Sequence, residues 1–75
     1  MKSKGWDTVI LSEPEYEHLV AEVHHDGQFL LLLDREDGRD AVSIAFPNRN
    51  GELGNRVLLT EFLEQLKAAA EDLKR

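Results

Sequence analysis

The segment from Phe29 to Leu33 constrains the fold more than any other part of the chain. It contains five consecutive apolar residues, Phe-Leu-Leu-Leu-Leu. Successive side chains of a strand point to opposite faces, so a strand with this sequence is apolar on both faces. Such a pattern is typical of a central strand that is covered on both sides. We therefore expect a sheet in which this segment is an inner strand.

Turn signals on both sides of this segment predict its neighbours. Asp26-Gly27 connects it to residues 16–24, where apolar and polar residues alternate with a period of two. Asp-Gly is a strong hairpin signal because a type I′ turn requires positive φ at both central positions. On the other side, residues 35–38 end in a glycine and predict a second turn. Residues 41–46 then follow as another strand.

The chain before residue 16 and after residue 46 completes the predicted meander. Trp6–Leu11 is rich in aromatic and β-branched residues and predicts a first strand, which Pro14 separates from the next one. Residues 47–55 carry two glycines and three asparagines and predict a loop. Residues 56–59 are suited to a short edge strand, although their pattern leaves open whether a fifth strand forms.

A helix is expected at the end of the chain. Thr60 is a suitable N-cap, and no glycine or proline interrupts residues 60–75. Apolar residues recur there at helical spacing and form one stripe: Phe62, Leu63, Leu66, Ala69, Ala70 and Leu73.

Together these elements predict one α+β domain over residues 1–75, with the sheet at about 5–59 and the helix at about 60–74. The expected architecture is a four- to five-stranded antiparallel β-meander with one C-terminal helix packed on one face, in two layers. One set of inward residues is expected to meet the helix: Leu19, Ala21, Val23, Val42, Ile44 and Phe46. The opposite face would remain open and apolar, which favours a homodimer through that face, although single exposed apolar residues are also ordinary.

The formal net charge of −6 is concentrated in the first half of the chain. Residues 1–40 contain ten acids and four bases, whereas residues 41–75 contain five of each. An acidic surface repels phosphate backbones, so nucleic acid is not an expected partner. It attracts a basic protein and speeds that encounter. The alternative is that the charge serves solubility alone.

The residues needed for common catalytic or metal sites are missing or badly spaced. There is no cysteine, and no serine lies in a nucleophile motif. His24 and His25 are adjacent on a strand and point to opposite faces, so they do not suit one metal ion. In the acidic stretch 34–40 the first ligand of a calcium loop would fall on Leu33. We therefore expect no enzyme, no cofactor and no metal. Since no apolar run has the length of a membrane span or signal segment, we expect a cytoplasmic protein without membrane contact.

The run from Trp6 to Glu22, followed by the Asp-Gly hairpin, resembles small acidic bacterial immunity proteins of polymorphic toxin systems. The similarity continues through Phe46-Pro47 and Val57-Leu58-Leu59 into the terminal helix. This resemblance implies a cytoplasmic protein that neutralises a toxin by binding it, often through an acidic surface on a basic nuclease. The alternative is a small homodimeric structural or regulatory protein. Charge and expected exposure, rather than a family motif, select the partner-binding residues: Glu13, Glu15, Glu17, Asp34, Glu36, Asp37 and Asp40.

Overall fold

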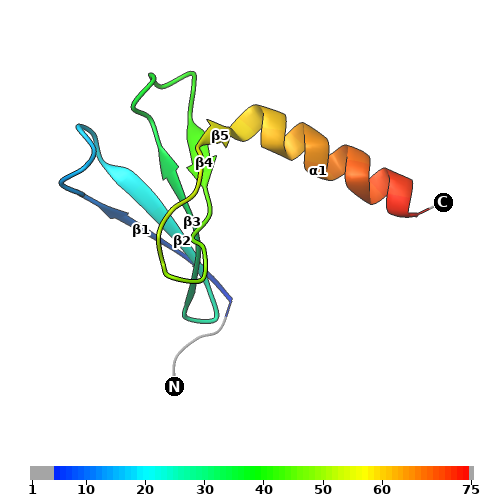
Figure 1. Ribbon diagram of the computed structural model, residues 1–75, viewed down its shortest axis with the longest axis horizontal. Helices are drawn as coiled ribbons and strands as arrows, with labels where there is room; N and C mark the ends of the chain where they lie inside the picture. Colours follow the sequence, from blue (N-terminus) through cyan, green and yellow to red (C-terminus); the bar gives the residue numbers. More distant parts are fainter. Residues whose placement is uncertain (1–4, 75) are drawn as a thin grey trace.

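The computed structural model describes residues 5–74 and confirms the predicted antiparallel meander followed by a C-terminal helix (Figure 1). The five strands form one sheet in the order β1-β2-β3-β4-β5, so each strand is hydrogen-bonded to its neighbours in sequence. The possible fifth strand is therefore present. The elements are β1 (Trp6–Leu11), β2 (Val20–His25), β3 (Gln28–Asp34), β4 (Ser43–Ala45), β5 (Val57–Leu58) and α1 (Leu59–Leu73).

The apolar strand β3 lies in the middle of the sheet, as its sequence predicts. The hairpin between β2 and β3 has positive φ at both turn residues, 53° at Asp26 and 84° at Gly27, which fits the expected type I′ geometry. Asp26 also accepts a hydrogen bond from the Gly5 backbone N–H at 2.6 Å. This bond ties the residue before β1 to the hairpin turn. From there β1 pairs with β2 along its whole length.

The strand register separates two faces of the sheet. One row runs across all five strands through Ile10, Ala21, Leu33, Ile44 and Val57. We call this side the open face. It carries most of the exposed apolar side chains of the sheet: Trp6, Ile10, Leu19, Phe46 and Val57.

The other side of the sheet, the covered face, holds most of the core. Val20, Leu32, Ala45 and Ser43 are all buried there. The long segment 46–56 between β4 and β5 folds back over this face. An antiparallel bridge between Pro47 and Leu53 closes it into a loop. In Figure 1 this segment passes across β2 and β3. A connecting loop, and not the helix, therefore closes the core on this side.

Helix α1 begins earlier than expected and covers less of the sheet. It starts at Leu59, directly after β5, so Thr60 lies inside the first turn and is not the N-cap. The cap position is Leu58, which makes no side-chain capping bond. The cause is the sheet itself: the Leu59 N–H donates to the Val42 carbonyl oxygen at 2.9 Å, so the ladder continues into the helix.

After this first turn α1 leaves the sheet (Figure 1). Among the described elements it contacts only β4 and β5, and none of its residues is buried. Phe62 packs on Phe46 with ring centroids 5.1 Å apart. The prediction that the helix meets Leu19, Ala21 and Val23 is therefore wrong for the single chain: β2 lies beyond its reach.

Candidate functional site

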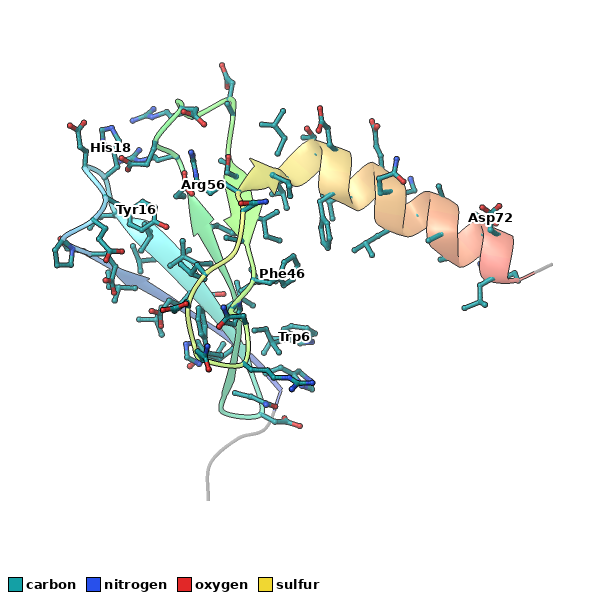
Figure 2. The ribbon with its side chains drawn as sticks, in the orientation of Figure 1. Trp6, Tyr16, His18, Phe46, Arg56 and Asp72 are labelled. Atoms are coloured by element: carbon teal, nitrogen blue, oxygen red, sulfur yellow. The ribbon has the colours of Figure 1, made fainter. Side chains whose placement is uncertain are left out.

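The meander places the β1–β2 loop and the β3–β4 loop at the same end of the sheet. Glu36 joins the two loops, because its carboxylate accepts hydrogen bonds from the backbone N–H groups of Glu17 and His18, each at 2.9 Å. All seven predicted partner-binding residues lie at this end, which we call the acidic end: Glu13, Glu15, Glu17, Asp34, Glu36, Asp37 and Asp40. Figure 2 shows Tyr16, His18 and Arg56 close to it.

Arg56 anchors the acidic end to the sheet. Its Nε and Nη2 atoms donate to the two carboxylate oxygens of Asp34 at 2.9 and 2.7 Å, a bidentate pair. The same Nη2 also donates to Asp37 at 3.0 Å and to the Ser43 hydroxyl at 3.4 Å. The Asp34 side chain is completely buried, whereas the Arg56 side chain is 37% exposed. One arginine therefore connects β3, β4, the β3–β4 loop and the end of segment 46–56.

Hydrogen bonds and burial at this end shift the pKa values of three groups. Burial alone would raise the pKa of the Asp34 carboxyl, but the hydrogen bonds from Arg56 and from the Glu36 backbone N–H outweigh burial and lower that pKa. The two backbone N–H groups of the β1–β2 loop lower the pKa of Glu36. Burial, followed by the nearby Asp34 charge, raises the pKa of Tyr16. The ionised carboxylates of Asp34 and Glu36 thus accept hydrogen bonds that hold the chain together at this end.

The seven acids differ in what they can offer to a partner. Glu15, Glu17, Asp37 and Asp40 are exposed. Glu13 and Glu36 are half-buried. Asp34 is only 2% exposed and is occupied by Arg56, so its prediction as a contact residue is corrected: it positions the loop and does not face a partner.

The charge of the acidic end remains strongly negative after its bases are included. Arg35, Arg39 and Arg56 lie in the same region, so seven carboxylates face three guanidinium groups and the net charge is −4. The whole chain carries −6. Most of the excess charge is therefore concentrated in two adjoining loops, which is the arrangement that steers a basic partner.

Two depressions border the acidic end. One, of about 530 Å³, lies between Tyr16, Arg56 and the residues 51–54 of the covering segment. The other, of about 410 Å³, lies on the open face and is mostly apolar, with Ile10, Leu19 and Leu33 among its lining residues. Charged and apolar surfaces thus adjoin each other at this end of the sheet, a combination common in protein interfaces.

The histidines do not gather into a ligand set in the described part of the chain. His24 Nε2 lies 3.2 Å from a Glu22 carboxylate oxygen, but His18 is on the acidic end and uses its backbone N–H for Glu36. Within residues 5–74 no group of three or more histidine, aspartate and glutamate side chains has the geometry to hold a metal ion.

Sequence reasoning did not foresee Arg56 and Tyr16. Arg56 was expected only as part of a possible edge strand, and Tyr16 as the start of the second strand. A signal for Arg56 was available, because Asp34 directly follows the five apolar residues of the central strand and ends that strand. A carboxylate in that position requires a buried partner.

The lowered pKa values predict how acid affects the fold. Because the folded chain binds protons at Asp34 and Glu36 less readily than the unfolded chain, their stabilisation is present above the ordinary carboxyl pKa of about 4 and decreases as the pH falls below it. We expect Asp34→Asn to flatten the loss of stability between about pH 5 and pH 2.5, measured by urea unfolding. Glu15→Gln, at an exposed position outside these hydrogen bonds, is the control substitution. An equal slope in the wild type and Asp34→Asn would contradict the assignment.

Fold and site together define a small α+β domain with an acidic loop end fixed by the pair of buried Asp34 and half-exposed Arg56. Comparison of the chain with family models, with curated proteins and with solved structures finds no match. Among the described residues no helix has both the length and the apolar character needed to cross a membrane.

Proposed function

We propose that this protein is a non-catalytic binding module that uses its acidic end to bind and neutralise a basic protein, in the manner of an immunity protein acting on a toxin. The observation that carries the proposal is the gathering of the acidic residues from two loops into one surface of net charge −4. Hydrogen bonds to the Glu36 carboxylate and from the Arg56 guanidinium fix both loops in place. A surface fixed before binding loses less conformational entropy when the partner arrives.

The exposed carboxylates of this end have a kinetic role in the proposal. Charges on the rim of an interface mainly raise the association rate and select against wrong partners. Glu15, Glu17 and Asp40 would steer the partner.

The test uses three baits that differ only in where charge is reversed. The loop variant carries Glu15→Lys, Glu17→Lys and Asp40→Lys, whose side chains take no part in the ion pairs of the described acidic end. The helix variant carries Glu64→Lys, Glu71→Lys and Asp72→Lys on exposed positions of α1. Each variant moves the formal net charge from −6 to zero, so net charge is matched and only its location differs.

We expect the wild type and the helix variant to capture the same basic protein from a lysate of the source cells at low salt, and the loop variant to lose it at least tenfold. Capture is compared by quantitative mass spectrometry against beads carrying the loop variant. If all three baits retain the same protein equally, or none retains a basic protein, the proposal is wrong.

A further inference from the structure

Beyond Phe62, which packs on Phe46, the apolar stripe of α1 is not covered by any part of the described chain. Leu63 is 48% exposed, Leu66 is 50% exposed and Leu73 is 86% exposed. On the open face of the sheet, Trp6 is 72% exposed and Ile10 is 61% exposed. We propose that two copies of the chain form a dimer in which α1 of each copy packs across the open face of the other copy. This interface adjoins the acidic end, and it does not depend on the proposed function.

The helix needs a covering surface for its own stability. Helices of about 15 residues are marginal in water when isolated, and in proteins most of their stability comes from packing an apolar face. α1 has 15 residues and buries none of them. Its stripe is nevertheless continuous, from Phe62 to Leu73, so the sequence specifies an amphipathic helix that lacks a partner inside one chain.

The junction between β5 and α1 prevents the helix from folding back over its own sheet. No loop residue separates Leu58 at the end of β5 from Leu59 at the start of α1. The Leu59 N–H is also held by the Val42 carbonyl oxygen at 2.9 Å, as the last bond of the ladder. A helix without a hinge that leaves its own sheet is suited to exchange between copies, since short connections favour swapping over intramolecular closure.

The open face has the character and size to receive the helix of a second copy. Its groove of about 410 Å³ is lined mostly by apolar side chains, among them Ile10, Ala21 and Val42. A 15-residue helix is about 22 Å long, and five strands spaced by about 4.8 Å span about 19 Å. Trp6 and Phe46 lie on the side of the sheet toward which α1 extends (Figure 2). The stripe and the open face are therefore matched in length. In a two-fold symmetric dimer, each helix would pack on the open face of the other copy.

The exposed area of the single chain exceeds what a compact chain of this mass would expose. The accessible surface is 6115 Å² for 8.5 kDa, whereas a compact monomer of that mass exposes about 4,700 Å². The excess is of the same order as the roughly 800 Å² per partner that a standard interface buries.

A matched pair of substitutions tests the interface. Ala70 lies on the stripe and Ala68 on the opposite side of α1, and both are exposed in the single chain. We expect the wild type to sediment as a dimer at about 100 µM, Ala70→Glu to weaken the dimer about tenfold or more, and Ala68→Glu to change it less than about twofold. Ala70→Glu should also lose helical circular dichroism on dilution. A monomeric wild type, or a dimer that both substitutions affect equally, overturns the proposal.

The reciprocal geometry is tested by a mixture of carbon-13-labelled and unlabelled copies. Filtered nuclear Overhauser spectra should connect leucine methyl groups of α1 in one copy with the methyl groups of Ile10, Ala21 or Leu33 in the other. Contacts between copies that join only helix to helix, or only β1 to β1, would contradict the exchange of helices.

Discussion

Replacing Arg56 by alanine is expected to reduce the free energy of unfolding by about 3 kcal/mol. The substitution removes the two hydrogen bonds that Arg56 donates to the Asp34 carboxylate, whose side chain is completely buried. An unpaired buried charge is among the most costly defects in a fold, and partial entry of water beside the half-exposed arginine keeps the loss near the lower end of the range. Small domains of this length have a total stability of about 4–11 kcal/mol. The variant should therefore lose roughly a quarter to three quarters of its stability, as measured by urea denaturation at neutral pH.

The control for Arg56→Ala is Asp37→Asn, which removes an exposed acid bound by the same guanidinium Nη2 atom. Asp37 is exposed and pairs with Arg56 at 3.0 Å, so its loss should cost less than about 1 kcal/mol. Similar losses for the two variants would show that Arg56 acts as a surface charge and not as the partner of a buried acid.

Replacing Leu32 by alanine is expected to cost about 3 kcal/mol. Leu32 is 3% exposed on the covered face of the central strand, opposite Ala45. Removing most of its side chain leaves a cavity beneath segment 46–56, and the neighbouring backbone is held by strand pairs on both sides. Urea unfolding at low protein concentration measures the loss.

Leu31 is the matched control, because it directly precedes Leu32 in the same strand and points to the open face. It is only half-buried in the single chain. Leu31→Ala should therefore cost about half as much as Leu32→Ala when the protein is dilute. If Leu31→Ala costs as much stability as Leu32→Ala or more at low concentration, the assignment of the core to the covered face is wrong.

The sequence predicted the order of the strands because their signals are local, although β2 begins at Val20 and not at Tyr16. The five apolar residues from Phe29 to Leu33 led directly to the central position of β3. Asp26-Gly27 likewise specified a turn that only positive φ values satisfy. Once these two elements were placed, the meander fixed which loops share an end, so the grouping of the acidic residues followed from strand order alone.

The position of the helix could not be predicted because it depends on a single long-range bond. The apolar stripe from Phe62 to Leu73 required a covering surface, and the nearest sheet face was the natural choice. The Leu59 N–H, however, is held by Val42 in the ladder, which directs the helix away from the sheet. Periodicity shows that a stripe needs a partner but does not show in which chain that partner lies.

The role of Asp34 was misjudged for a related reason. In the sequence it is the first of a run of charged residues that reads as an exposed turn. In the structure it is the last residue of β3 and lies on the covered face opposite Ser43, where Arg56 meets it from 22 positions further along the chain. Local composition describes the turn correctly, but burial of its first residue is set by the long segment that returns over the sheet.

The measurement that tests the central claim most directly is the rate constant for association with the captured basic protein, as a function of salt, for the three charge variants. We expect the wild-type and helix-variant rate constants to fall at least tenfold between about 20 and 300 mM salt, because screening removes electrostatic steering. The loop variant should associate slowly at every salt concentration. Equal rate constants for all three proteins, with no dependence on salt, would contradict the account of the acidic end as the binding surface.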